Sequence, residues 1–360
     1  MKILVFNWRD ISHPWAGGAE TNIHELAKRW VAQGHQVTLF CSTYPGCKPE
    51  ETIDGIRILR RGSRFTVYLH ACWNYLTQLR REKFDVVIDD VNGVPFFTPL
   101  YVHKPRVTII HHLINNIFFK ELKAPFSWLA YAAEQVVMPV LYKNEKIVTV
   151  SESSKDELLK FGLKNISVIY NGTDLKCSNP KIKTRNPSIC YVGRIKNYKR
   201  LDILLKLVKQ LNIDNLNVYI AGDGDALQHL KELAEALELK NVKFFGHVSD
   251  DEKIKILQCS WVFVTPSEKE GWGITAIEAN ACGTPVVAFN VLGLKDSIVD
   301  GKTGFLVNNE HELKEKVLTL LDNINLRSDM SNNAFEWSKN FSWDKSAEDF
   351  EKILGDVKNG

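Results

Sequence analysis

Short apolar runs alternate with amphipathic helical patterns from the first residues of the chain. An apolar run at residues 2–7 leads into a glycine-containing loop, a helical pattern with one apolar face follows, and a second apolar run covers 37–41. This strand–loop–helix–strand order predicts a βαβ unit, whose crossover is right-handed and whose strands are parallel. The chain is therefore expected to fold as an α/β protein built on a parallel sheet.

The alternation continues to about residue 150, breaks, and then starts again. Residues 176–188 hold two prolines, several polar residues and no periodicity, which is typical of a linker. A length of 360 residues also suits two domains rather than one. We expect an N-terminal Rossmann-like domain at 1–175, a second one at 186–340, and a C-terminal helix at 341–360 that returns to the first. The strands predicted in order are 2–7, 37–41, 86–88, 107–110, 147–150, 188–192, 218–221, 242–245, 262–264 and 286–288.

Composition excludes several classes of protein. The hydrophobic fraction of 44% and the charged fraction of 25% are those of a globular chain, and the net charge of +3 does not mark a nucleic-acid binder. The N-terminus lacks the pattern of a signal peptide and no apolar run is long enough to span a bilayer, so a cytoplasmic protein is expected. The seven cysteines form no C-x-x-C pair, which argues against a zinc site and predicts reduced, structural thiols.

Two glutamates in the segment 265–279 carry the strongest functional pattern. Glu270 and Glu278 lie eight residues apart on either side of a Gly-x-Gly turn, Gly271-Trp272-Gly273. Such a turn is expected to open a helix whose first amides face an anion. The amides concerned are those of Gly273, Ile274 and Thr275. The alternative is a pair of solvated surface glutamates, which the surrounding Thr-Pro-Ser and the apolar run at 281–288 disfavour.

This segment resembles the E-x₇-E signature of retaining GT-B glycosyltransferases, specifically glycosyltransferase family four (glycosyl transferases group one). The likeness extends over nearly the whole chain in seven short pieces that occur in the family's order. These are 17–20, 150–155, 171–174, 191–194, 222–224, 245–246 and 300–304. The resemblance implies the GT-B architecture, in which two Rossmann-like, doubly wound parallel-sheet domains face an interdomain cleft.

The implied reaction moves a sugar from a nucleoside-diphosphate sugar to an acceptor hydroxyl with retention of configuration. It would serve the biosynthesis of a glycan, a polysaccharide or a glycolipid, and the acceptor would be a sugar, a glycolipid or a small molecule. The donor would be linked to UDP or GDP, and no further cofactor is expected. Nucleic acid is not an expected partner, since the aromatic residues follow helical spacing.

The resemblance also assigns roles to cations and glycines. Arg194 and Lys199 would hold the donor's pyrophosphate, because a guanidinium and an ammonium suit a diphosphate, and no metal would then be needed. Glu278 would accept hydrogen bonds from the ribose, and Glu270 would contact the sugar. The other donor-binding positions implied are Gly17, Gly18, Gly193, Gly222, Gly271, Trp272, Gly273, Ile274 and Thr275.

Two histidines follow the predicted strand 107–110. His111 matches the position of the family's active-site histidine, and His112 is its neighbour. In the front-side mechanism implied for retaining members, the leaving diphosphate deprotonates the acceptor, so His111 would hydrogen-bond the sugar or acceptor rather than act as a separate base. Asp89-Asp90 follows another strand and is interpreted as a strand end, because no other carboxylates stand at ligand spacing.

A basic and aromatic stretch leaves two interpretations open. Arginines precede a helical pattern with aromatic residues, and Ile117-Phe118-Phe119-Lys120 adds more of both kinds. Such a surface suits the inner face of a membrane or a lipid-linked acceptor, but an ordinary amphipathic helix with a solvated basic face explains it equally well. The residues of the first stretch are Arg57, Arg60, Arg61, Arg64, Tyr68, Trp73, Tyr75, Leu76, Arg80, Arg81 and Lys83.

Three other functions are kept as alternatives. A nucleotide-sugar epimerase of related fold would act without an acceptor, and a catalytically silent GT-B homologue would serve as a partner subunit. An NAD-dependent oxidoreductase is disfavoured, because Gly17-Gly18 lacks the G-x-G-x-x-G spacing and no acidic residue follows the second strand at the required distance.

Overall fold

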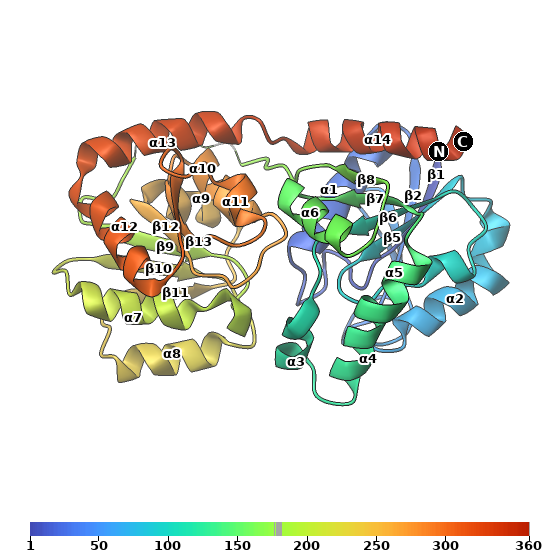
Figure 1. Ribbon diagram of the computed structural model, residues 1–360, viewed down its shortest axis with the longest axis horizontal. Coiled ribbons are helices and arrows are strands. Elements are labelled where there is room, and N and C mark those ends of the chain that lie inside the picture. The colour runs from blue at the N-terminus through green and yellow to red at the C-terminus, as the bar shows by residue number, and fades with distance from the viewer. Residues whose placement is uncertain (176, 178–181, 360) are drawn as a thin grey trace. The chain divides into compact units, whose positions relative to one another are not determined.

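The computed structural model describes residues 1–175, 177 and 182–359 (Figure 1). The chain divides into two compact units: unit 1 combines Met1–Asn171 with Trp343–Gly360, and unit 2 is Gly172–Ser342. Of the linker predicted at 176–188, residues 176 and 178–181 lie outside the described residues.

Unit 1 is built on an eight-stranded sheet in the order β3-β4-β2-β1-β5-β6-β7-β8. All neighbouring strands are parallel except β3, which runs antiparallel to β4. The strands β3, β4 and β8 are not among those predicted. β3 and β8 are short and partly exposed, whereas β4 is mostly buried but arginines interrupt its apolar run. The strands are β1 (Lys2–Phe6), β2 (Gln36–Cys41), β3 (Glu50–Ile53), β4 (Ile56–Arg60), β5 (Val86–Val91), β6 (Arg106–Ile110), β7 (Lys146–Thr149) and β8 (Ile166–Val168).

The C-terminal helix belongs to unit 1. The indole of Trp30 lies 5.2 Å from the ring of Phe350, measured between centroids, and its Nε1–H donates to the carbonyl of Ala347 at 3.2 Å. This buried contact holds the last helix against the first. The helices of unit 1 are α1 (Gly18–Ala32), α2 (Val67–Thr77), α3 (Phe118–Glu121), α4 (Phe126–Ala132), α5 (Met138–Leu141), α6 (Glu152–Lys160) and α14 (Trp343–Asn359), with a π-helical turn at Ala133–Val137 between α4 and α5.

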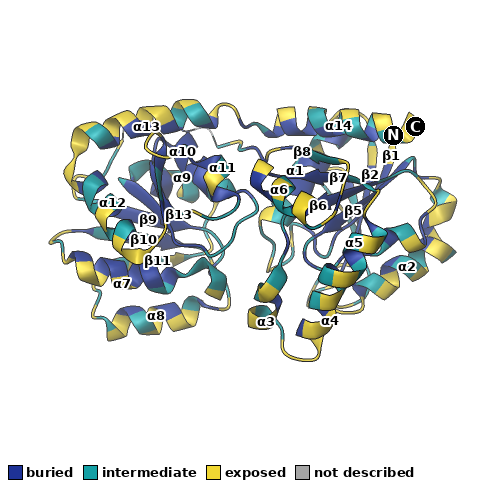
Figure 2. Cartoon of the chain, viewed as in Figure 1, coloured by how far each residue is buried: buried dark blue, intermediate teal, exposed yellow. Residues whose placement is uncertain are grey.

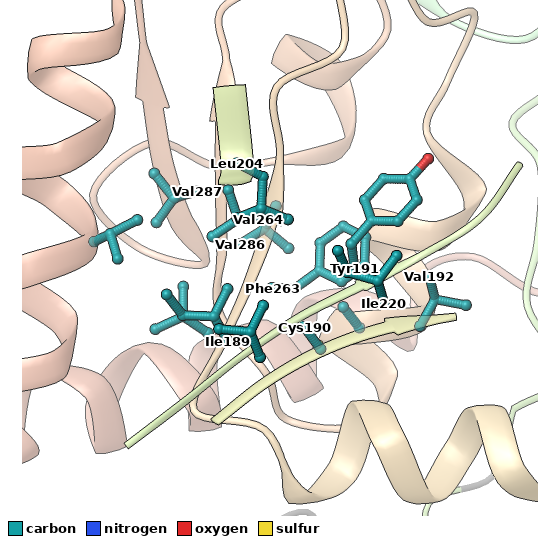
Figure 3. Packing of buried hydrophobic residues seen from close by; sticks show 14 of the residues in the cluster. Ile189, Cys190, Tyr191, Val192, Leu204, Ile220, Phe263, Val264, Val286 and Val287 are labelled. Carbon is teal, nitrogen blue, oxygen red and sulfur yellow. The ribbon is translucent and has the colours of Figure 1, made fainter. Parts of the chain in front are cut away.

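Unit 2 has a six-stranded, wholly parallel sheet in the order β11-β10-β9-β12-β13-β14. The central strands β9, β12 and β13 are apolar and almost fully buried, as their continuous apolar runs predict (Figure 3). The strands are β9 (Ser188–Val192), β10 (Asn217–Ala221), β11 (Val242–Gly246), β12 (Val262–Thr265), β13 (Val286–Phe289) and β14 (Gly304–Val307). The helices are α7 (Leu201–Leu211), α8 (Leu227–Ala236), α9 (Asp250–Cys259), α10 (Ile274–Ala281), α11 (Leu294–Ser297), α12 (Glu310–Asp322) and α13 (Ile324–Ser338).

Both sheets are doubly wound. In unit 1 the chain proceeds from β1 outward through β2 and β4 and then returns to place β5 on the other side of β1. In unit 2 it proceeds from β9 through β10 and β11 and returns to place β12 on the other side of β9. The prediction of two Rossmann-like α/β domains is therefore confirmed. Within the described residues, no helix is both long enough and apolar enough to cross a bilayer.

One expectation about the cysteines is wrong. Cys177 and Cys282 form a disulfide, with their Cα atoms 5.2 Å apart, although they are separated by 105 residues. Such a pairing cannot be read from spacing, because the fold alone brings the two positions together. The remaining cysteines, which are free, are Cys41, Cys47, Cys72, Cys190 and Cys259.

The prediction that Arg60 belongs to an exposed basic surface is also wrong. Its side chain is fully buried, and its guanidinium binds both carboxylate oxygens of Asp10, at 2.6 and 3.0 Å. A third contact reaches Glu51. Burial alone would raise the pKa of Asp10, but the hydrogen bonds and charge of Arg60 outweigh it and hold that pKa below its usual value.

Replacing Arg60 by methionine should therefore destabilise unit 1 strongly, because it leaves Asp10 as an unpaired buried carboxylate. We expect Arg60→Met to lower the free energy of unfolding by about 3–5 kcal/mol. The matched control Arg57→Met should lower it by at most about 1 kcal/mol, because the Arg57 side chain, which pairs with Glu50 and Glu82, is 40% exposed. Hydrogen exchange of the amides in β2 and β4 measures the difference. Equal losses in the two variants would contradict the assigned role.

Candidate functional site

The reversal of strand order marks a place for a ligand in each sheet. Ligands of doubly wound folds bind beyond the carboxyl ends of the two strands where the order reverses. In unit 2 those strands are β9 and β12, which are followed by the loop with Arg194 and the loop with Glu270. In unit 1 they are β1 and β5, and His111 follows the next strand, β6.

The loop after β9 is held by backbone contacts with the loop after β10. The amide of Gly193 donates to the carbonyl of Ala221 at 3.0 Å, and the amide of Ile195 donates to that of Asp223 at 2.9 Å. A Cβ atom on Gly222 would lie 1.8 Å from the carbonyl oxygen of Gly193, so a side chain is excluded there. The two glycines thus let the loops approach closely and fix the backbone of Arg194.

Lys199 and Glu270 form an ion pair between the loops after β9 and β12. Their side chains are 13% and 15% exposed, and the amide of Glu268 donates to the carbonyl of Tyr198 at 2.9 Å beside them. Burial by itself lowers the pKa of Lys199, but the Glu270 carboxylate outweighs it and the pKa is raised. The ammonium is therefore charged and fixed in position at neutral pH.

The Gly-x-Gly turn leads into helix α10, as predicted, and α10 begins directly after Gly273. Gly293 lies against the turn with φ +81°, and a Cβ atom on it would stand 2.6 Å from the carbonyl oxygen of Gly271, so this position also requires glycine. The Trp272 side chain points inward and packs edge to face against Phe341, with centroids 5.0 Å apart. Trp272 is thus placed to anchor the turn.

Glu278 lies within α10, is 8% exposed, and accepts a hydrogen bond from Nζ of Lys253 at 2.8 Å. Burial raises the pKa of Glu278, and Lys253 opposes part of that rise. Lys253 stands in α9, whose start is fixed by a capping box between Ser249 and Glu252. Sequence reasoning missed Lys253, because nothing in a pattern of surface lysines distinguishes the one that meets Glu278.

His111 is anchored to a buried carboxylate. Its Nε2 lies 2.9 Å from Oδ1 of Asp90, which is fully buried on the adjacent strand β5. Burial raises the pKa of Asp90, and the charge and hydrogen bond of His111 counteract part of the rise. This contact leaves Nδ1 as the ring nitrogen that can bind a further group, and it gives Asp90 a role beyond that of a strand end.

Glu20 organises the glycine loop of unit 1. It is 1% exposed, and its carboxylate accepts hydrogen bonds from the amide of Gly17 at 2.7 Å, from Nε of Arg9 at 3.0 Å and from the side-chain amide of Asn92 at 2.8 Å. The network fixes the loop from which α1 starts at Gly18. Arg9 and Asn92 were not identified from the sequence, since neither lies in a recognisable motif.

The predicted site residues thus fall into two groups. Unit 2 brings Lys199 to Glu270 and holds the Arg194 loop against Gly222, while Glu278 binds Lys253 instead of another predicted residue. Unit 1 contains Gly17, Gly18 and His111, and their meeting with the unit 2 residues stays a prediction. Among the described residues, no cluster of three or more His, Cys, Asp or Glu side chains could hold a metal ion.

Comparison with known proteins shows two family profiles in succession along the chain. The profile described as Glycosyltransferase Family 4 matches residues 16–176, and the profile described as Glycosyl transferases group 1 matches residues 176–337. Between them they account for nearly the whole sequence.

Several curated relatives carry the same general description. An uncharacterized glycosyltransferase of Methanocaldococcus jannaschii is 25% identical over 395 residues, covering 100% of this chain and 99% of its own. A second from that organism is 32% identical over 222 residues, and one from Haemophilus influenzae is 33% identical over 217 residues. These two matches cover 60% and 58% of this chain, and the chain spans 61% of the length of each relative.

Solved structures share the fold at low sequence identity. The sucrose-phosphate synthase of Thermosynechococcus elongatus aligns with a TM-score of 0.85 at 18% identity, covering 99% of this chain and 98% of that one. An Anabaena protein solved in complex with UDP-glucose aligns with a TM-score of 0.77 at 18% identity, covering 99% and 100% of the two chains.

The pairing of Lys253 with Glu278 predicts a pH-dependent loss of stability. Lys253→Met leaves Glu278 buried without its cation, so the pKa of Glu278 rises further above the unfolded value. A carboxyl group whose pKa is raised in the folded state costs no stability below its unfolded pKa of 4.5. The cost grows as pH rises from that value to the folded pKa and is constant above it. The fall in Tm should therefore be small at pH 4.5 and large at pH 8.

The exposed Lys255, two residues along the same helix, supplies the control. Lys255→Met should change Tm little at either pH, because the Lys255 side chain is exposed and pairs with no buried carboxylate among the described residues. A Tm loss in Lys253→Met that is the same at both pH values, or that equals the loss in Lys255→Met, would show that the buried carboxylate does not depend on Lys253.

Proposed function

Because the chain belongs to the glycosyl transferases group 1 family, we propose that it transfers a sugar from a nucleoside-diphosphate sugar to an acceptor hydroxyl with retention of configuration. The observation that carries this proposal is the arrangement after β9 and β12. There the sheet order reverses, Lys199 is fixed by Glu270, Arg194 is presented by a glycine-supported loop, and α10 begins.

Each of these groups suits one part of the donor. Arg194 and Lys199 bind the diphosphate, since both are cations held in fixed loops. The first amides of α10 add hydrogen bonds to the same anion. Glu278 accepts hydrogen bonds from the ribose and is held in position by its ion pair with Lys253. Glu270 contacts the sugar hydroxyls while its ion pair orients Lys199.

The reaction we propose is a front-side displacement. The bond from the anomeric carbon to the diphosphate oxygen breaks, and the acceptor oxygen bonds to the same face of that carbon. The acceptor proton passes to the departing phosphate oxygen. Arg194, Lys199 and the α10 amides stabilise the negative charge that develops on the leaving group, without a metal ion. His111, oriented by Asp90, hydrogen-bonds the sugar or acceptor.

Unit 1 supplies the acceptor side of this proposal. Gly17 and Gly18 form a loop without side chains that can approach the donor closely, and Glu20 fixes its backbone. The acceptor would be a sugar, a glycolipid or a small molecule, the donor nucleotide uridine or guanosine diphosphate, and the location the cytoplasm.

A thermal-shift panel tests the ligand class. A ligand that binds only the folded chain stabilises it, by about 2.7 kcal/mol at a hundred times its Kd. UDP or GDP, and at least one of their sugars, should raise Tm, and NAD should not. Stabilisation by NAD with no response to any nucleoside diphosphate would overturn the proposal.

Variants separate the diphosphate contacts from the ribose contact. Arg194→Ala and Lys199→Ala should weaken nucleoside diphosphate binding by roughly 10- to 100-fold each but leave binding of the nucleoside unchanged, because the lost bonds go to phosphate. Glu278→Ala should weaken both ligands. Lys206→Ala, which removes an exposed cation of α7, is the matched control. Calorimetry at fixed ionic strength gives the affinities, and an unchanged nucleoside affinity in Glu278→Ala would remove that residue from the site.

Product analysis separates transfer from the two remaining alternatives. Incubation with the stabilising nucleotide sugar should release nucleoside diphosphate, in the presence of EDTA as well as without it, and the sugar product should retain the donor's anomeric configuration by NMR. Formation of an epimeric nucleotide sugar would identify an epimerase. Tight donor binding with no turnover against any acceptor would indicate a silent partner subunit.

A further inference from the structure

Large apolar side chains are exposed along two helical segments of unit 1. In and beside α2, Leu69 is 74% exposed and Trp73 is 69% exposed, and in α4 Trp128 and Leu129 are 63% exposed. Exposed residues along both segments appear in Figure 2. We call this set the apolar face: Phe65, Leu69, Trp73, Leu76, Phe119, Phe126, Trp128, Leu129, Val136 and Val140.

Ring contacts join the two segments into one surface. The rings of Phe65 and Phe126 stack with centroids 4.6 Å apart, and Phe119 meets Trp128 edge to face at 4.8 Å. Phe65 directly precedes the N-cap of α2 and Phe126 is the first residue of α4, so the starts of the two helices touch. Contiguous apolar surface of this kind marks an interaction site rather than a scatter of single residues.

The charged residues that flank the apolar face in the sequence are predominantly positive. Residues 65–79 contain no Asp, Glu, Lys or Arg, and the arginines 61, 64, 80 and 81 flank them. Between Lys123 and Lys143 the single charged residue is Glu134, which is 1% exposed and accepts hydrogen bonds from the amides of Ile114 and Asn115. The Glu134 carboxylate is therefore buried within unit 1 and is not part of the exposed rim. Glu121 lies between Lys120 and Lys123, so that rim keeps a net positive charge.

The geometry points to the surface of an anionic lipid bilayer as the occupant of the apolar face. Tryptophan and phenylalanine side chains enter the boundary between headgroups and acyl chains, while arginine and lysine at the rim bind the anionic headgroups. A second copy of this chain fits less well, because a two-fold contact through this face would bring two positive rims together.

Binding of this kind has a definite electrostatic signature. The chain should bind vesicles of phosphatidylcholine with 30 mol% phosphatidylglycerol and bind pure phosphatidylcholine at least tenfold more weakly, in a flotation assay without nucleotide. Raising the salt concentration to 0.5 M should reduce binding to the anionic vesicles, since salt screens the attraction between the rim cations and the headgroups. Since no donor is required, failure here would leave the proposed transfer reaction untouched.

Substitutions on the apolar face supply the residue-level test. The variant Leu69→Ser/Trp73→Ser/Trp128→Ser/Leu129→Ser should lose at least tenfold in vesicle affinity with little change in Tm, because all four side chains are exposed. The control Leu159→Ser/Ile324→Ser removes exposed apolar side chains elsewhere and should bind normally. Arg80→Glu/Arg81→Glu should reduce binding to anionic vesicles, and Lys231→Glu/Lys240→Glu should not.

Fluorescence quenching locates the contact. Lipids brominated in the acyl chain should quench the emission of the natural chain, and Trp73→Phe/Trp128→Phe should lose that quenching but keep vesicle binding. The inference fails if the natural chain does not float with anionic vesicles, or if the four-serine variant binds as well as the natural chain. It also fails if the natural chain is a dimer that the four serines dissociate, because the face would then be a protein interface.

Discussion

Parallel pairing at the point where strand order reverses is the constraint on which the rest of this molecule depends. β9 and β12 are neighbours in one sheet, but the chain leaves β9 toward β10 and leaves β12 toward β13, on the opposite side. The two loops start side by side and diverge, so their backbones cannot fill the space beyond the strand ends. Lys199 and Glu270 meet across that space, and α10 starts from the same loop.

Four of the residues that we place in the chemistry have an ionisable partner already in position. Glu270 pairs with Lys199, Glu278 with Lys253 and His111 with Asp90, over sequence separations of 71, 25 and 21 residues. A buried charge without a partner is too costly to keep, and a paired one is fixed in orientation before any ligand arrives. The same pairing that stabilises the fold thus preorganises the site.

These separations explain which features a sequence can predict. The buried strands and the turn at Gly271–Gly273 are local patterns, so they were predicted close to their observed bounds. The partners Lys253 and Asp90 and the disulfide between Cys177 and Cys282 depend on which strands become neighbours, which no local pattern contains. The antiparallel β3–β4 pair was missed because β3 is partly exposed and because arginines interrupt the apolar run of the buried β4.

The basic and aromatic stretch shows how a fold sorts residues that look alike in sequence. In α2 the residues Val67, Ala71 and Tyr75 follow one another at intervals of four and are buried, while Leu69, Trp73 and Leu76 lie on the other side and are exposed. Arg60 and Phe118, interpreted from the sequence as surface residues, are buried too. A helix that is apolar on every side is normally covered by protein or membrane. Unit 1 covers one side of α2, so the presence of tryptophan and leucine on the other side is explained if a second apolar phase covers it.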